Sequence, residues 1–160
     1  MEIRTATIAD LAEIAQIEAV CFPASEAATE ESIARRLQHY PNHFWVLLDE
    51  GRMVGFVNGM VTDEPNLRDE MYENAAMHDE NGAWQMIFGV DTIPACRRRG
   101  CAEQLLNHVI GQARAQGRKG LVLTCKNALL HYYGKFGFVS EGVSQSTHGD
   151  VRWYQMRLTF

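Results

Sequence analysis

The 160-residue sequence lacks any apolar run near the ~20 residues that a membrane-spanning helix needs, and Phe44–Leu48 is typical of its short apolar stretches. Its start, Met1–Asp10, carries two acids and no apolar segment of the kind found in signal peptides. Bases are few beside acids, 15 against 20, so the net charge is -5 and no basic face for nucleic acid is expected. We therefore expect a cytoplasmic protein whose partner is neither a membrane nor a nucleic acid.

The sequence also lacks a C-x-x-C pair, and none of its cysteines has a histidine at zinc-finger spacing. We expect four free thiols in a reducing compartment and no bound metal; the cysteines are Cys21, Cys96, Cys101 and Cys125. No internal repeat, low-complexity tract or Pro/Gly/Ser-rich linker interrupts the chain. Its length suffices for one hydrophobic core, so the prediction is a single domain over residues 1–160.

Short apolar runs that alternate with amphipathic stretches predict an α/β domain with the element order β-α-α-β-β-β-α-β-α-β-β. Helices are expected after the N-caps Thr7 and Thr29, after Pro94, and over Asn127–Phe136. The acidic stretch Asp63–Asn81 is predicted to be irregular. Strands are expected at Glu2–Ala6, His43–Leu48, Met53–Thr62, Ala83–Val90, Leu121–Cys125, Phe138–Val143 and Val151–Leu158.

The most informative stretch runs from Val90 to Ala102, where a buried strand leads through Pro94 into three arginines, a glycine and a long helix. The first turn of such a helix has unpaired amides and the positive end of the helix dipole. Gly100 permits a backbone shape and a close approach that a side chain would block. These features predict a cradle for an anion such as a pyrophosphate, although an ordinary basic loop before a helix remains the alternative.

Two common nucleotide motifs are missing from this loop. It has neither G-x-x-x-x-G-K-[ST] nor G-x-G-x-x-G, so a Walker-type site and a dinucleotide fingerprint are both unsupported. A second informative motif follows the next apolar strand, where the chain reads Asn127…Tyr133-x-x-Phe136-Gly137-Phe138.

Together the two motifs resemble the GNAT superfamily of acetyl-CoA-dependent N-acetyltransferases. Arg97-x-x-Gly100-x-Ala102 matches the superfamily's (Q/R)-x-x-G-x-(G/A) signature, and the second motif matches its following helix and tyrosine-to-Gly-Phe ending. Within the superfamily the chain is most similar to the arylalkylamine (serotonin) N-acetyltransferase branch. That similarity is carried by Phe22–Glu26, Tyr133–Phe138 and Arg152–Met156.

The resemblance implies the GNAT fold, an α/β architecture with a mixed central sheet of six to seven strands flanked by about four helices. It implies acetyl-CoA as co-substrate, lying between the strands Ala83–Val90 and Leu121–Cys125, and no metal. Much of the recognition would use backbone groups. The residues implied to bind acetyl-CoA are Val90, Asp91, Thr92, Arg97, Arg98, Arg99, Gly100, Cys101, Ala102 and Asn127.

The resemblance further implies acetyl transfer to the primary amine of a small molecule, an arylalkylamine or a polyamine, by direct attack in a ternary complex. Tyr133 is implied to be the general acid that protonates the leaving thiolate, with Tyr132 as the competitor on another face of the helix. Phe22 and Trp153 are implied to line the amine pocket. Aromatic walls suit flat apolar groups and can attract a cationic amine.

The general base departs from the family pattern. An alkylamine is mostly protonated at pH 7, so a proton must be removed before attack. The vertebrate arylalkylamine enzymes place two histidines where this chain has Met86 and Phe88. Several bases therefore remain open: bulk water, Asp91, Glu26, Glu64, His78 and His148.

Other functions also remain open from the sequence. One rival is a protein or peptide N-acetyltransferase, and the other is a non-catalytic acyl-CoA-binding regulatory module. The seven acids of residues 63–80 would steer a cationic amine or simply form a solvated face. The sequence leaves open the amine, the acyl-chain preference and the oligomeric state, a homodimer included.

Overall fold

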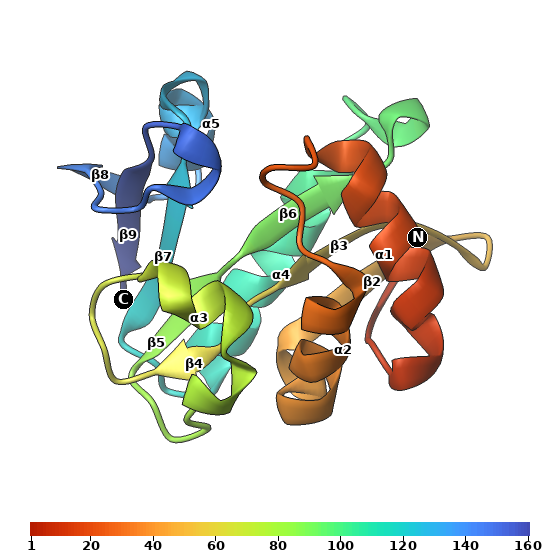
Figure 1. Ribbon diagram of the computed structural model, residues 1–160, viewed down its shortest axis with the longest axis horizontal. Coiled ribbons are helices and arrows are strands. Elements are labelled where there is room, and N and C mark those ends of the chain that lie inside the picture. The colour runs from red at the N-terminus through yellow and green to blue at the C-terminus, as the bar shows by residue number, and fades with distance from the viewer.

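The computed structural model describes residues 1–160 and contains nine strands in two sheets (Figure 1). The strands are β1 (Glu2–Thr5), β2 (Phe44–Asp49), β3 (Arg52–Asn58), β4 (Val61–Thr62), β5 (Trp84–Ile87), β6 (Gly89–Thr92), β7 (Gly120–Cys125), β8 (Val139–Val143) and β9 (Tyr154–Thr159). One sheet has the order β1-β2-β3-β6, and the other has the order β4-β5-β7-β9-β8. Only β5 and β7 pair in parallel, and every other ladder is antiparallel.

Helices cover both faces of the sheets. Leucines and a valine of α4 pack into the largest core cluster on one face, whereas α1 and α2 close a second cluster on the other (Figure 1). None of the helices has the length and the apolar content to cross a lipid bilayer. The five α-helices are α1 (Leu11–Cys21), α2 (Glu30–His39), α3 (Asp69–Glu73), α4 (Cys101–Ala115) and α5 (Leu130–Gly134).

The predicted N-caps start the first two helices. The Asp10 carboxylate accepts the backbone N–H of Thr7 at 2.8 Å, as the capping-box pattern predicts, and a short 3-10 turn leads into α1. The hydroxyl of Thr29 accepts the backbone N–H of Ser32 at 3.1 Å and so caps α2. That helix ends at His39, two residues before a proline that cannot continue the hydrogen-bond ladder.

Two of the strands predicted as continuous are interrupted. The break between β3 and β4 falls at Gly59, where an added Cβ would lie 1.8 Å from the carbonyl oxygen of Met86. Only glycine fits this close approach. Opposite it, β5 and β6 are separated by Phe88, whose backbone N–H donates to the Asn58 carbonyl at 2.7 Å. With each interrupted strand counted once, seven strands result, in agreement with the prediction.

One prediction about the acidic stretch was wrong. Part of the segment predicted to be irregular forms α3, so the fold has five α-helices rather than about four. The helix has five residues, and a segment this short cannot show the apolar repeat by which longer helices are recognised. The predicted helix Asn127–Phe136 is likewise shorter, with a 3-10 turn before α5.

The feature that positions the site is the divergence of β6 and β7. The parallel ladder ends at the pair Ile87 and Leu123. Beyond it β6 pairs with β3 alone, and β7 continues beside β9. Figure 1 shows the two strands opening away from each other, with α5 at the end of β7 and α1 beside β6. The edge of β6 that faces β7 therefore has no strand partner.

Candidate active site

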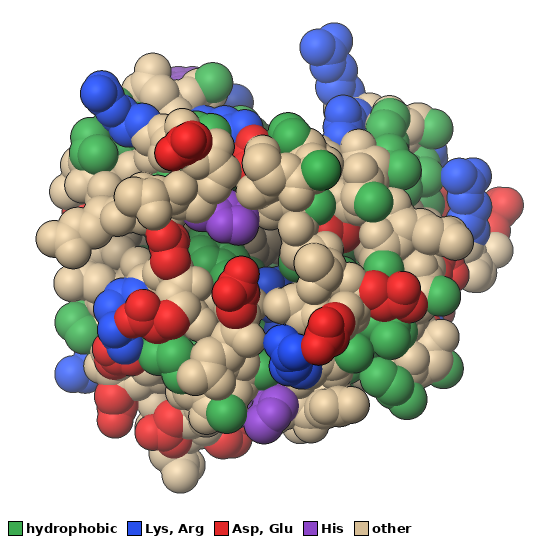
Figure 2. Space-filling view, in the orientation of Figure 1, with side chains coloured by type: hydrophobic (Ala, Val, Ile, Leu, Met, Phe, Trp, Pro, Cys, Tyr) green, Lys and Arg blue, Asp and Glu red, His purple; other side chains and the backbone are tan.

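A cavity of about 320 Å³ lies where β6 and β7 separate. Its lining comes from α1 and the segment after it, α2, α3, both diverging strands, α5 and the segment before β9. Figure 2 shows a hollow between the two halves of the molecule, with hydrophobic side chains on its floor and acidic ones on its rim. The cavity brings together four residues predicted for the site: Phe22, Val90, Tyr133 and Trp153.

The structure separates the two adjacent tyrosines of α5. Tyr133 lines the cavity and is 8% exposed, whereas Tyr132 lies outside it and packs against the Tyr133 ring with centroids 5.3 Å apart. Burial raises the pKa of Tyr133 far above that of a free phenol, and the Cys125 thiol adds to the effect. Tyr133 therefore keeps its proton through the neutral pH range and can donate it to a thiolate formed beside it.

The loop predicted to bind a pyrophosphate leads into α4. Gly100 is the N-cap of this helix with φ +77°, and no side chain caps the helix. An added Cβ on Gly100 would meet nothing within 4 Å, so the backbone angle, not crowding within the chain, requires glycine. Arg98 also has a positive φ of 62°. The side chains of Arg97, Arg98 and Arg99 are exposed, and the first-turn amides of α4 are left without side-chain partners.

The remaining residues predicted to bind acetyl-CoA are spread around this loop. The Cys101 side chain is buried in the core, so its backbone N–H is the group available to a ligand, and Ala102 follows it half-buried. The Thr92 carbonyl already accepts from the Cys21 thiol and from the Arg97 guanidinium, each at 3.3 Å. Asn127 is exposed at the turn that follows β7.

Sequence reasoning missed Arg36 as a cavity residue. Its guanidinium is buried and donates to the Asn58 side-chain oxygen at 3.0 Å and to the Tyr72 carbonyl at 2.8 Å. It lies 5.1 Å from the centroid of the Phe88 ring, and its Nε has no hydrogen-bond partner. Tyr72, also missed, stacks on His148 with centroids 5.4 Å apart. These aromatic and guanidinium planes form one wall of the cavity.

Glu18 is the third cavity residue that sequence reasoning missed. It lines the cavity, is 7% exposed, and accepts the backbone N–H of Ala28 through Oε2 at 2.9 Å. The sequence did carry a signal for it. Glu18 is four residues after Ile14 and three before Cys21, so it lies on the inward face of α1. A carboxylate on an apolar stripe is unusual enough to mark a site.

The structure also shows which of the candidate bases lie at the cavity and what each of them contacts. Glu64 and His78 lie outside the cavity, in an exposed ion pair and in a separate polar cluster respectively. The Glu26 carboxylate pairs with the Lys126 ammonium at 2.9 Å. His148 lines the cavity, and one of its ring nitrogens, Nε2, lies 2.8 Å from the Glu26 carbonyl and donates to it.

The acidic segment has a largely structural role. Of its seven acids, Glu73 alone lines the cavity. Asp69 accepts hydrogen bonds from Ser146 and Thr147 and so ties α3 to the turn before β9.

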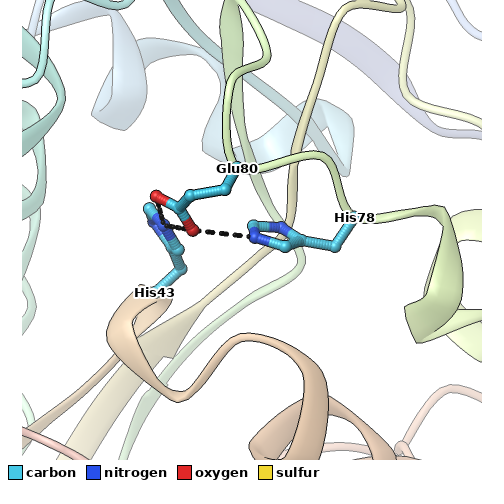
Figure 3. A group of neighbouring side chains, drawn as sticks. All are labelled: His43, His78 and Glu80. Carbon is cyan, nitrogen blue, oxygen red and sulfur yellow. Dashed lines mark hydrogen bonds and ion pairs between the residues drawn. The ribbon is translucent and has the colours of Figure 1, made fainter.

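His43, His78 and Glu80 form a polar cluster outside the cavity (Figure 3). His78 Nδ1 accepts the backbone N–H of Val61 at 3.0 Å, so its Nε2 carries the proton and donates to Glu80 at 3.0 Å. A metal ion on that Nε2 would need the proton on Nδ1, where the Val61 N–H already points. The hydrogen bonds therefore favour a structural network at this place over a metal centre.

The other polar side chains of this cluster also have hydrogen-bond partners. The side-chain amide of Gln85 donates to the carbonyls of Gly59 and Met86, each at 2.8 Å, which fixes its oxygen toward His43 Nδ1 at 2.9 Å. Arg118 completes the cluster with Nη2 at 3.1 Å from the Glu80 carboxylate.

The model of the acetyltransferase (GNAT) family matches residues 11–138, and the chain belongs to this family. Serotonin N-acetyltransferase of Mesocricetus auratus is 29% identical over 112 residues, which cover 68% of this chain and 52% of that protein. The chain thus spans about half the length of the curated relative it matches. At this identity the arylalkylamine branch stays a prediction.

Solved structures agree along the whole chain. The GphF GNAT-like decarboxylase in complex with isobutyryl-CoA superposes with a TM-score of 0.85 at 24% identity, covering 99% of both chains. The ribosomal-protein-S18-alanine N-acetyltransferase from Escherichia coli superposes with a TM-score of 0.74 at 19% identity, covering 99% of this chain and 92% of that one. These similarities confirm the predicted α/β GNAT fold.

Proposed function

We propose that the protein is an acetyl-CoA-dependent N-acetyltransferase that acetylates the primary amine of a small molecule, an arylalkylamine or a polyamine. The observation that carries the proposal is the cavity at the divergence of β6 and β7. It combines an unpaired strand edge, a phenol that keeps its proton and aromatic walls. Membership of the acetyltransferase (GNAT) family supports acyl transfer as the reaction.

The residues present fit an acyl-CoA. The free edge of β6 near Val90 offers backbone groups to the amides of a pantetheine arm. The uncapped first turn of α4, with Gly100 and the exposed arginines beside it, suits the pyrophosphate. The isobutyryl-CoA bound by GphF supports an acyl-CoA as the donor. When bound, acetyl-CoA supplies an acetyl group activated as a thioester.

The walls of the cavity favour a small acceptor. Phe22 and Trp153 offer flat apolar surfaces to an aromatic or aliphatic amine. Lys126 lies 5.8 Å from the Trp153 ring centroid and also pairs with Glu26, while His148 donates to the Glu26 carbonyl. These contacts join the segment after α1 to the segments beside β7 and β9. A peptide acceptor would need an open groove where this bridge lies.

Direct attack accounts for the reaction without an acyl-enzyme. The nitrogen lone pair forms the new C–N bond, the C–S bond breaks with its electron pair on sulfur, and Tyr133 gives its proton to that sulfur. The nitrogen loses a proton as the amide forms, and that proton restores the Tyr133 hydroxyl, so the products are a neutral amide and a thiol. The buried Cys125 is a poor nucleophile because burial raises the pKa of its thiol to about 11. Its neighbour at 3.6 Å is the Met156 sulfur rather than a histidine.

A thiol-release assay over a panel of arylalkylamines, polyamines and peptide amines tests the proposal, with products identified by mass. We expect acetyl transfer to small amines to exceed transfer to peptides. Faster transfer to peptides would favour the protein N-acetyltransferase instead. Binding of acetyl-CoA with no transfer to any amine would favour a regulatory module.

One observation favours a second candidate, decarboxylation of an acyl-CoA that bears a carboxylate. Arg36 has an unpartnered Nε and lines the cavity, and a guanidinium is well suited to hold a carboxylate. GphF, which shares the fold, is named a GNAT-like decarboxylase. Incubation with malonyl-CoA in the absence of an amine separates the two functions. Release of carbon dioxide supports decarboxylation, and an unchanged thioester contradicts it.

A further inference from the structure

Two buried carboxyl groups meet beneath the cavity. An added Cβ on Gly89 would lie 3.0 Å from Asp91 Oδ1 and 3.9 Å from Glu18 Oε1, so both side chains converge on the same glycine of β6. The side-chain nitrogen of Asn58 would lie 3.6 Å from the same point. Its amide is oriented by Arg36, which donates to its oxygen. The reaction as described above uses neither carboxyl.

The two carboxyls differ in their surroundings. Asp91 is 0% exposed, and neither of its oxygens accepts a hydrogen bond from an N–H or hydroxyl group of the protein. A bare carboxylate in such a place is prohibitively unfavourable, so Asp91 holds a proton. Burial and then the neighbouring Glu18 raise the pKa of Asp91 well above its ordinary value. Glu18, by contrast, reaches the cavity and is anchored by the Ala28 backbone N–H.

We propose that Glu18 is the base that accepts the proton of the incoming ammonium, and that Asp91 is a positioning residue held as the neutral acid beside it. The inference rests on the proposed N-acetyltransferase function. It supplies the base that the sequence left unassigned.

The proton balance of the step is simple. The ammonium N–H bond breaks with its electron pair left on nitrogen, and the proton forms an O–H bond on Glu18. The carboxyl pair changes from one negative charge to none, and the amine becomes the neutral nucleophile. Because two opposite charges are lost together, a buried site of low dielectric favours this transfer relative to water. The proton leaves to solvent after the product departs.

The charged and titratable groups that face the pair come from three helices. Cys21 of α1 adjoins Asp91, and its thiol donates to the Thr92 carbonyl. Arg36 of α2 is the facing cation, although two of its nitrogens are held by Asn58 and Tyr72. Tyr133 of α5 is near enough for the Asp91 carboxyl to contribute to the raised pKa of its phenol. None of these groups can replace Glu18 as a carboxylate.

The test compares Glu18→Gln, Asp91→Asn and the wild type by the pH dependence of kcat/KM. The matched control is Glu13→Gln, an exposed glutamate five residues earlier on α1, which should behave as wild type. Loss of a general base lowers the rate by about 100-fold or more, so we expect that loss for Glu18→Gln with an alkylamine, together with loss of the acid limb of the profile. Asparagine mimics a neutral aspartic acid, so Asp91→Asn should lose less than about tenfold.

A second amine separates a base from a merely structural residue. An analogue of the best alkylamine with two or three fluorines on its β carbon is largely neutral at pH 8, because the fluorines withdraw electrons from the nitrogen, and it needs no base before attack. We expect Glu18→Gln to acetylate it within about threefold of wild type. An equal loss for both amines, or a greater loss for Asp91→Asn than for Glu18→Gln, would overturn the assignment.

Infrared spectroscopy provides a readout that does not depend on turnover. At neutral pH the wild type should show the C=O stretch of a protonated carboxyl, and Asp91→Asn should lack it. Absence of this band from the wild type would contradict the neutral Asp91. A wild type that binds acetyl-CoA and acetylates no amine would refute the proposed function and the base role together, while the band would still report the state of Asp91.

Discussion

The polar residues around Glu18 and those around Glu80 form two clusters that differ in how completely their hydrogen-bonding groups are paired. Around Glu80, the polar groups of His43, His78 and Gln85 have partners, which are drawn in part in Figure 3. Around Glu18, both oxygens of Asp91 and the Nε of Arg36 have none. Both clusters hold buried charged or titratable groups, so burial alone does not distinguish them.

The difference in hydrogen bonding between the two clusters indicates that they have different roles. A fully paired cluster contributes to stability and specifies one packing arrangement. A buried polar group without a partner weakens the fold and persists where a ligand or a reaction needs it. We therefore expect changes near Glu18 to alter catalysis with little loss of stability, and changes near Glu80 to do the reverse.

Among changes at the cavity, Tyr133→Phe should have the largest effect on turnover. Loss of the proton donor should lower kcat by about 100-fold, with acetyl-CoA affinity unchanged because the ring remains. The Phe ring keeps the contact with Phe138, so the melting temperature should hold. Steady-state thiol release and calorimetry measure these quantities. Tyr132→Phe is the matched control, expected within about threefold of wild type, and equal losses for both variants would break the assignment.

A smaller effect should follow Trp153→Ala. Loss of the aromatic wall and of its contact with Lys126 should raise the KM for an arylalkylamine by about tenfold, with a smaller rise for a polyamine. Initial rates at varied amine concentration measure the change. An unchanged KM for every amine would show that the acceptor binds away from this wall.

In the cluster around Glu80, the change Glu80→Gln should lower the free energy of unfolding by about 1 kcal/mol at neutral pH and leave turnover unchanged. The loss is modest because Glu80 is 60% exposed on its side chain. Denaturant unfolding measures it. Glu70→Gln, which removes an exposed ion pair with Arg68, is the control with an effect near zero. A loss of turnover without a loss of stability would reverse the comparison between the two clusters.

The cluster around Glu80 also makes the stability of the folded protein depend on pH. Burial opposes ionisation of Glu80, but hydrogen bonds from His43 and His78 hold its pKa below the ordinary value. Burial likewise lowers the pKa of His78. In both cases the unfolded chain binds the proton more readily, so stability is present near neutral pH and is lost as the pH falls into the acid range. The loss should be smaller for Glu80→Gln than for wild type.

Backbone motifs made part of the site predictable. The Arg97–Ala102 loop can be recognised from its glycine and from the helix that starts after it, and both are local features of the sequence. The choice of Tyr133 over Tyr132 followed from a fixed offset to the Gly-Phe ending. Tyr133 lines the cavity, and its role as the proton donor stays a prediction. Phe22 and Trp153, far apart in sequence, both line the cavity, and their contact with an amine stays a prediction.

The rest depended on tertiary contacts. Glu18 and Asp91 are 73 positions apart in the sequence, and they come together only because α1 packs against β6. In the sequence Arg36 resembles any other cation of a helix. Only the structure shows that its guanidinium donates hydrogen bonds to Asn58 and Tyr72. The interruption at Phe88, which separates the two sheets, comes from the approach of Gly59 to Met86. Glu18 itself is marked in the sequence as a carboxylate on the apolar face of α1, but the contacts that these residues make have no local signature.

The most direct measurement is a crystal structure of the protein with acetyl-CoA. The pantetheine arm should lie along the free edge of β6 near Val90, the sulfur should be within hydrogen-bond reach of the Tyr133 hydroxyl, and the pyrophosphate should contact the amides at the start of α4. A carrier bound elsewhere, with the space between β6 and β7 empty, would contradict the account.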